Sequence, residues 1–339
     1  MKKVLLYLAI FFASGTLILV SALTFVDNFI YSLSQTSAIE TRSLSGTSAI
    51  SDEEKIELPK DVTDIQYSFD NKYYSYLKDN KVYINSLDNG ETVDTIEEED
   101  PICYFNLLYD KNLIIYFTEE KDGNISKVTL NTYEIANKKK NEFNTIKVTN
   151  FSRVKDMNMS PVINILYINI ETKNGNYTSN TLYRIDLFNS MSIVKSGTII
   201  NRLFMLQQHD RIYYEDDDSN IYSSAGVLRL FKNDVDMLGY DYDDNLYFLD
   251  KTTKQTVYKV KSNSIVDTIE LSDSDLVTTY SNCYGVYLVY PTYVINVSAK
   301  DPYRRIGKFS KYVKFEAIKG NVMYVRTSNN LLMQSELAD

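Results

Sequence analysis

The sequence has 339 residues, of which 44% are hydrophobic and 24% charged, and its formal net charge is −9. This composition is typical of a folded protein and excludes a disordered or collagen-like chain. Binding to nucleic acid needs Lys and Arg clustered in one patch. The nearest such cluster, in residues 137–143, has three lysines in a predicted turn, so we predict no nucleic-acid partner.

The chain begins with a segment typical of a membrane anchor. After Lys2 and Lys3, no charged residue occurs from Val4 through Val26, and an uncharged stretch of this length can span a bilayer as a helix. By the positive-inside rule the two lysines place the N-terminus in the cytoplasm. We therefore predict that residues 1–27 form a signal-anchor helix that crosses the cytoplasmic membrane once, with all of the following chain outside the cytoplasm.

A cleaved signal peptide is the alternative for this segment, because the small residues at 20–22 suit a cleavage site. The apolar run is longer than the core of a usual signal peptide, which favours a retained helix. Ala9 and Ala13 have the small-xxx-small spacing that allows close packing against a helix of another membrane protein. Residues 28–53 are rich in Ser and Thr and are predicted to form a tether.

Residues 54–339 contain seven copies of one pattern. Each copy is a short alternating run centred on a tyrosine, then a polar turn and a second alternating run, as expected for paired strands. The central tyrosines lie between 34 and 51 residues apart and are Tyr76, Tyr116, Tyr167, Tyr213, Tyr247, Tyr287 and Tyr324. A period near 40 with several strands per repeat is typical of a β-propeller, since blades stacked in a ring bury both faces of each sheet.

The predicted fold class is therefore all-β, a seven-bladed β-propeller preceded by one N-terminal transmembrane helix. A β-sandwich is the alternative, but a sandwich of this length would have to divide into two domains. The uneven spacing is attributed to insertions at hairpin tips, such as residues 171–180. To close the ring, the strand-like residues 54–59 are predicted to pair with residues 331–337 in the last blade.

Residues 68–96, SFDNKYYSYLKDNKVYINSLDNGETVDTI, resemble a blade of the TolB-like and dipeptidyl-peptidase N-terminal propellers. SFDNK stands where Ser-Pro-Asp-Gly-Lys is expected, and LDNGETV matches the second turn. The resemblance, looser in the other repeats, spans about residues 55 to 337. It implies a bacterial propeller that serves as a docking platform for other proteins. Peptidase members also have a hydrolase domain with a Gly-x-Ser-x-Gly motif, which this sequence does not contain.

Few residues suggest chemistry. His209, the single histidine, lies beside Asp210 in a predicted turn, and a Ser-His-Asp system would also need a nucleophile. The acidic runs at 214–220 and 241–245 offer oxygens suited to calcium. Asp and Asn also favour turns by bonding their own backbone, and both runs lie where turns are expected. We predict solvated turns at both runs, and no catalytic residue, metal or cofactor.

Three functions are compatible with these sequence features. The leading hypothesis is a non-enzymatic, membrane-tethered scaffold that binds a protein, a peptide or a cell-wall polymer at one face of the propeller. Exposed tyrosines would supply contact area at such a face. The second hypothesis is a cell-envelope hydrolase that cleaves glycan or peptide with carboxylates at the propeller mouth. The third is an accessory subunit of a membrane complex, in contact with its partner through the N-terminal helix.

Overall fold

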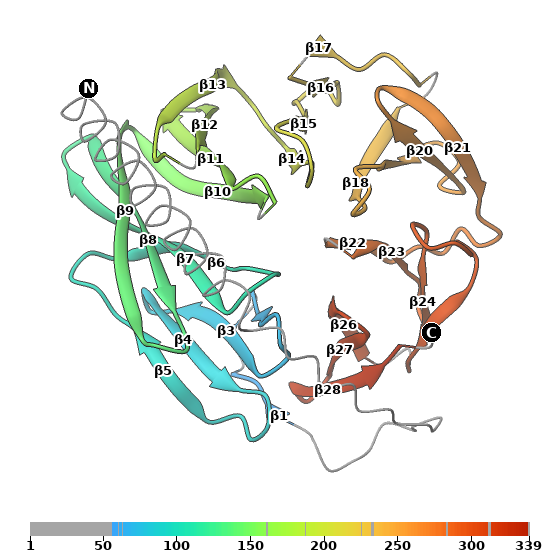
Figure 1. The fold of residues 1–339 in the computed structure, drawn as a ribbon, viewed down its shortest axis with the longest axis horizontal. Helices are drawn as coiled ribbons and strands as arrows, with labels where there is room; N and C mark the ends of the chain where they lie inside the picture. Colours follow the sequence, from blue (N-terminus) through green and yellow to red (C-terminus); the bar gives the residue numbers. More distant parts are fainter. Residues whose placement is uncertain are drawn as a thin grey trace, which may run out of the picture. The chain divides into compact units, whose positions relative to one another are not determined.

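The computed structural model describes residues 56–337, except positions 60, 63, 161, 187, 225, 232, 233, 283, 311 and 312. The described chain forms seven antiparallel sheets of four strands each, and Figure 1 shows these sheets arranged as blades around a ring. This confirms the predicted seven-bladed β-propeller. The described residues contain no helix long and apolar enough to cross a membrane. The predicted anchor and tether, residues 1–27 and 28–53, lie outside the described residues.

Blades are numbered along the chain. Blade 1 consists of β2 (Gln66–Tyr67), β3 (Tyr73–Lys78), β4 (Lys81–Ser86) and β5 (Thr92–Ile96), and blade 2 of β6 (Ile102–Leu107), β7 (Leu113–Asp122), β8 (Ile125–Glu134) and β9 (Lys139–Thr149). Blade 3 consists of β10 (Phe151–Ser160), β11 (Ile165–Asn174), β12 (Tyr177–Ile185) and β13 (Met191–Thr198), and blade 4 of β14 (Arg202–Met205), β15 (Ile212–Glu215), β16 (Ile221–Ser223) and β17 (Gly226–Val227).

Blades 5 to 7 complete the ring. Blade 5 consists of β18 (Val235–Tyr240), β19 (Leu246–Asp250), β20 (Thr256–Lys261) and β21 (Ser264–Glu270). Blade 6 consists of β22 (Thr278–Asn282), β23 (Gly285–Val289), β24 (Tyr293–Asn296) and β25 (Arg305–Lys308). Blade 7 consists of β26 (Val313–Lys319), β27 (Val322–Thr327), β28 (Leu331–Glu336) and β1 (Ile56–Glu57). In each blade the first of these strands lies innermost, where it contacts the first strand of a neighbouring blade.

The ring closes by pairing the two ends of the described chain. β1 pairs with β28 in antiparallel register, with Ile56 opposite Leu332 and Glu57 opposite Leu331. This confirms, for Ile56 and Glu57, the predicted pairing of residues 54–59 with 331–337; residues 54 and 55 lie outside the described part of the chain. Gly90, at the turn after β4, has a φ of +76°, and a Cβ there would lie 2.9 Å from Ile56 Cγ2. The closing strand therefore packs directly over a turn of blade 1.

The seven repeat tyrosines all lie on the second strand of their blades, and each is at most 7% exposed. Several of their hydroxyls donate hydrogen bonds: Tyr116 to Glu98 (2.5 Å), Tyr167 to Asp210 (2.8 Å), Tyr213 to Asn263 (2.8 Å), Tyr247 to Asp241 (2.9 Å) and Tyr324 to Asn71 (2.9 Å). A tyrosine thus fills the apolar space between blades and ends at a polar group. Burial and a nearby carboxylate raise the pKa of Tyr116, Tyr167 and Tyr247, so their hydroxyls stay protonated.

Turn chemistry explains why residues 68–96 fold as a blade. Asp79 and Asn80, between β3 and β4, have φ values of 51° and 60°, as a two-residue hairpin turn of type I′ requires. Before β3, the Ser68 Oγ accepts the backbone N–H of Tyr73 (2.9 Å) and donates to Asp70 (2.8 Å). Asn71, which stands where glycine is expected in the similar propellers, has a φ of 56°.

The core is divided among the junctions between blades. Seven clusters of buried apolar side chains are present in the described chain, and each combines residues of two adjacent blades. A single four-stranded sheet has two apolar faces that it cannot cover by itself. The stability of every blade therefore depends on both of its neighbours.

Candidate functional site

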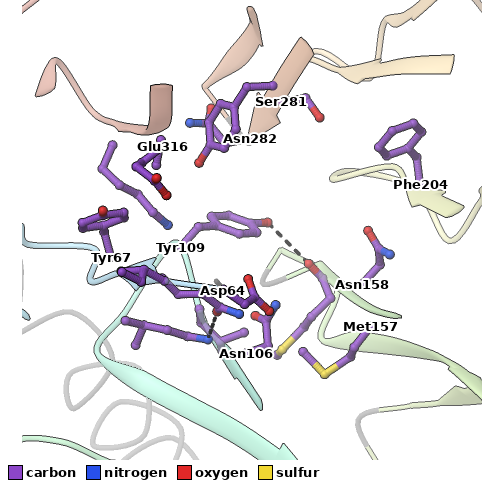
Figure 2. Close-up of a pocket in the computed structure, with 18 of the residues that line it drawn as sticks. Asp64, Tyr67, Asn106, Tyr109, Met157, Asn158, Phe204, Ser281, Asn282 and Glu316 are labelled. Atoms are coloured by element: carbon purple, nitrogen blue, oxygen red, sulfur yellow. Dashed lines mark hydrogen bonds between the residues drawn. The ribbon is translucent and has the colours of Figure 1, made fainter. Parts of the chain in front are cut away.

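The innermost strands surround a cavity of 370 Å³ at one end of the central channel. We call this end the turn mouth, because here each innermost strand ends and turns into the second strand. Every blade contributes to the lining (Figure 2), with side chains that include Tyr67, Asn106, Asn158, Phe204, Tyr240, Asn282 and Glu316. The site is therefore a product of the closed ring and of no single repeat.

Amide side chains of the channel wall join neighbouring blades. Gln66 Nε2 donates to the Phe105 carbonyl (3.3 Å), and Gln66 Oε1 accepts the Leu107 N–H (2.7 Å). Asn158 Nδ2 donates to the Leu203 carbonyl (3.2 Å), and Asn282 Nδ2 to the Ile318 carbonyl (2.8 Å). Each bond satisfies a buried polar group across a blade junction. Each of these three amides thereby uses one N–H of its NH₂ group in a bond to the next blade.

A hydrogen-bonded chain ties four blades together at the turn mouth. The Tyr109 hydroxyl, just after β6, bonds to the side chain of Gln207 and lies 3.4 Å from the Met159 carbonyl. Gln207 Nε2 in turn lies 2.9 Å from the Tyr240 hydroxyl. Gln207 is only 1% exposed, so this chain is a fixed part of the wall. It orients the Tyr109 ring toward the cavity (Figure 2).

Between blades 7 and 1, the cavity wall holds buried polar groups. Glu316 Oε1 lies 2.9 Å from Arg326 Nε and 3.3 Å from Lys314 Nζ, and the Glu316 side chain is 6% exposed. The Tyr67 ring stacks on Tyr324 with ring centroids 4.0 Å apart. The Tyr67 hydroxyl has no hydrogen-bond partner among the described residues, although Tyr67 is 1% exposed. Burial and the charge of Glu316 raise the pKa of Tyr67.

Asp64 supplies a carboxylate at the rim of the same cavity. It lies just before β2 and remains exposed, and it has no hydrogen bond or ion pair with any residue in the described part of the chain. Nearby protein atoms raise the pKa of its carboxyl because they displace part of its water. Asp64 therefore adds a partly desolvated carboxylate to a cavity whose lining also includes Lys319.

The opposite end of the channel has a second hollow, of 380 Å³, lined by blades 3 to 6. Asp156 on β10 lies there, with Oδ1 unpaired among the described residues and Oδ2 3.4 Å from Asn169 Nδ2. Burial raises the pKa of Asp156 to about 6. Arg202 on β14 donates to the Met237 carbonyl (2.6 Å), so its charge is directed into the next blade.

The structure places His209 in a turn, as predicted. Its Nδ1 lies 2.6 Å from Asp244 Oδ2, and the ring is 69% exposed. Asp210, its neighbour in the sequence, instead accepts from Tyr167 and lies 2.8 Å from the Arg184 guanidinium. Within the described chain, the His209 ring makes its only hydrogen bond with Asp244, so the geometry provides no nucleophile for it.

Both acidic runs are turns, as predicted, but the prediction that both are solvated is wrong for the second run. Asp241, Asp244 and Asn245 are only 8%, 7% and 5% exposed, because their side chains bond to neighbouring protein groups, as Asp244 Oδ1 does to the Gln207 N–H. Asp216 Oδ1 accepts the backbone N–H groups of Asp218 (3.0 Å) and Asn220 (2.8 Å). Asp241 Oδ1 in the same way accepts the backbone N–H groups of two residues that follow it. Within the described residues, no group of His, Cys, Asp and Glu side chains is arranged to hold a metal ion.

The residues of the turn mouth were not among the residues predicted from the sequence. They lie one strand before each repeat tyrosine, in short runs such as DIQY (64–67), YFNL (104–107) and MNMS (157–160). An amide between apolar neighbours recurs in these three runs, and this was the available signal. The tyrosine pattern marks the second strand of each blade, so it gives no indication of the innermost strand.

Comparisons with known proteins give likenesses in fold alone. No family model and no curated protein matches this chain. Similar solved structures include a chain of the mitotic checkpoint complex (10% identity, TM-score 0.48, covering 88% of this chain and 100% of that chain). The WD40 β-propeller domain of Doa1 is also similar (13% identity, TM-score 0.41, covering 80% of this chain and 78% of that chain). So is a eukaryotic initiation factor (8% identity, TM-score 0.43, covering 84% of this chain and 90% of that chain). The seven-bladed architecture rests on the strand pairing itself.

Proposed function

We propose that this chain is a non-enzymatic interaction scaffold whose propeller binds a protein or peptide at the turn mouth. The observation that supports this proposal is the cavity lined by all seven blades. It combines aromatic rings with a few polar groups, as binding sites commonly do. The hydrogen bonds between blades fix its wall before any partner arrives, so little order is lost on binding.

We further propose that the propeller is held outside a bacterial cytoplasmic membrane. The uncharged residues 4–26 support a retained helix, and the TolB-like pattern in residues 68–96 supports the same location. A cell-wall polymer is then a second class of partner within reach. The small-residue pair Ala9 and Ala13 supports an accessory role in a membrane complex as the alternative.

A hydrolase with carboxylates at the mouth receives less support. Glycoside cleavage by the usual mechanism needs two carboxyl groups that face the substrate. Asp64 and Glu316 both line the cavity, but Glu316 is already engaged by Arg326 and Lys314. Asp64 alone does not form the pair, so we propose no catalytic residue.

Site-specific photo-crosslinking in the native host tests the scaffold proposal. The photoreactive tyrosine analogue p-benzoylphenylalanine replaces Tyr242, which is 61% exposed in the β18–β19 turn at the turn mouth. The matched control replaces Tyr177, which is 85% exposed at the start of β12 in the β11–β12 hairpin. We expect a defined protein adduct from position 242 and none from 177. Equal adducts, or an adduct from 177 alone, would contradict binding at the turn mouth.

Exchanging residues 1–27 for an unrelated membrane helix distinguishes the scaffold proposal from the alternative of an accessory subunit. The adduct at position 242 persists after the exchange if the propeller itself selects the partner. Its loss would show that the partner is recruited through the N-terminal helix, and the accessory role would then replace the scaffold proposal.

A further inference from the structure

The turn-mouth cavity is lined by charges of both signs, which are those of Asp64, Glu316 and Lys319. Glu316 is engaged by Arg326 and Lys314, and its side chain is 6% exposed. Lys319, at the end of β26, is 9% exposed and has an interaction partner within the protein. Two of these three charges are therefore buried and already partnered.

The third charge, that of Asp64, does not by itself select a cation. Asp64 lies exposed at the rim and has no hydrogen bond or ion pair in the described chain. A cation drawn to Asp64 would also meet the positive charge of Lys319, and an anion drawn to Lys319 would meet Asp64 and Glu316. Moving a charged group into a partly dry cavity costs free energy unless an opposite charge is free to pair with it. The lining therefore favours a ligand without net charge.

Two uncharged side chains of the lining have hydrogen-bonding capacity to spare. Asn158 Nδ2 donates to the Leu203 carbonyl, and the Asn158 Oδ1 has no partner in the described chain. The Ser281 hydroxyl likewise makes no hydrogen bond with any described residue. Unlike the Tyr67 hydroxyl, neither of these atoms is completely buried, so a ligand can reach both. An amide and a hydroxyl can each donate and accept hydrogen bonds.

The cavity holds these groups on opposite sides of the channel. Figure 2 shows Asp64 and Asn158, from blades 1 and 3, on one side and Ser281, from blade 6, on the other. The rings of Tyr109 and Phe204 belong to the same lining, and ligand pockets commonly combine such rings with a few polar groups that fix orientation. A primary amide carries N–H donors at one end and a carbonyl acceptor at the other, so it can bond to both sides.

We propose that the turn-mouth cavity takes the uncharged amide side chain of a glutamine or asparagine from the protein partner. The NH₂ group of this amide donates toward Asn158 and Asp64, and its carbonyl accepts from Ser281, directly or through an ordered water. Asn106 adds a further amide to the wall, and a cavity of 370 Å³ falls within the size range of ligand pockets. This inference rests on the proposed scaffold function and specifies the chemistry of its partner.

Saturation-transfer NMR titrations of matched peptides on the full-length protein test this inference. The probes are acetyl-Gly-Gly-X-Gly-Gly-amide, where X is glutamine, glutamate, methionine or lysine. Glutamate has the shape of glutamine with a charge, and methionine has a similar length without the amide. We expect the glutamine peptide to bind about tenfold more tightly than the other three, because each of these leaves a polar or charged group without a partner.

Ser281→Ala should lower the affinity for the glutamine peptide severalfold and leave that for the methionine peptide unchanged, because it removes only a hydroxyl. Ser281 packs closely on Gly239 of blade 5, and alanine keeps the Cβ of this contact, so the melting temperature should not change. Ser264→Ala is the control. Ser264 is exposed at the start of β21 and outside the cavity lining, so its loss should leave the affinity for both peptides unchanged.

Three results would overturn the inference: a glutamine peptide that binds no more tightly than the others, equal effects of Ser281→Ala and Ser264→Ala, or no binding of any peptide. Binding of N-acetylglucosamine in the absence of peptide binding would assign the cavity to a glycan instead. The scaffold proposal is judged separately by the crosslink at position 242. A crosslinked partner with no preference for glutamine would remove only the inference about the amide side chain. A missing crosslink would remove the scaffold itself.

Discussion

The junction between blades 2 and 3 and the junction between blades 7 and 1 solve the same packing problem with different chemistry. The first is an apolar sandwich around Phe117, which is fully buried among aliphatic side chains of both blades. The second packs Tyr67 on Tyr324 beside the ion pair of Glu316 and Arg326. Blades 2 and 3 contain strands of up to 11 residues, whereas blade 7 is completed by β1, which has two residues.

This difference separates stability from function. The junction between blades 2 and 3 is packed mainly by apolar side chains, and several of its cross-blade hydrogen bonds, such as that of Asn144 with Asn189, lie at exposed positions or at the mouth. Buried charges and an unpaired hydroxyl add little to stability, because removing them from water costs about as much as their pairing returns. Their position in the wall of the turn-mouth cavity makes them available to the proposed binding function. Substitutions at the two junctions should reveal this division.

The largest effect is expected from Phe117→Ala. This change leaves a cavity between blades 2 and 3 and should lower the free energy of unfolding by about 4 kcal/mol. Denaturant unfolding followed by circular dichroism measures the loss. Phe143→Ala is the control, because Phe143 is 41% exposed on β9 and should cost less than about 0.5 kcal/mol. Similar losses for both changes would show that this junction does not carry the stability.

Glu316→Gln should lower the free energy of unfolding by about 3 kcal/mol, because Arg326 would remain buried without its carboxylate. Replacing both residues by methionine should cost clearly less than the single change. The same unfolding measurement provides both values. A double variant as unstable as Glu316→Gln would mean that the pair itself stabilises the junction, against the division between stability and function.

Asp156 makes stability depend on pH. Its pKa is raised to about 6 in the folded protein, so the folded state holds a proton that the unfolded state releases above about 4. Stability should be greatest below about pH 4, fall by about 3 kcal/mol in total as the pH rises through the folded-state pKa, and stay level above about pH 7 with respect to this group. Asp156→Asn should remove this slope in unfolding experiments between pH 4 and 7. If the pH dependence of stability is unchanged in Asp156→Asn, it arises from other carboxyl groups.

The smallest effect is expected from Tyr67→Phe. The Tyr67 hydroxyl has no partner among the described residues, so its removal should change the free energy of unfolding by less than about 0.5 kcal/mol. Tyr213→Phe is the comparison, since it breaks the bond to Asn263 across a junction and should cost about 1 kcal/mol. Thermal melting of both variants measures these two changes in stability. A larger loss of stability in Tyr67→Phe than in Tyr213→Phe would contradict the prediction.

Local pattern was enough to predict much of the fold. The repeat tyrosines marked the second strand of every blade, and the Asp79–Asn80 turn fixed the first hairpin. Residues 171–180, expected as an inserted tip, are mostly paired strand, with Asn174 opposite Tyr177. Pairing of the extended arms satisfies backbone groups that a loop of this length would leave to water. The alternating pattern there was too polar to indicate strands.

The sequence by itself determined the number of blades, the strand order and the closure through β1, because period, alternation and turn residues are all local signals. The turn mouth was decided only by the tertiary structure. Asp64, Tyr67, Asn158 and Glu316 belong to three different blades, and nothing along the chain indicates that they face one cavity. Ring closure brings together residues more than 250 positions apart, such as Tyr324 and Asn71. A site made in this way has no linear motif.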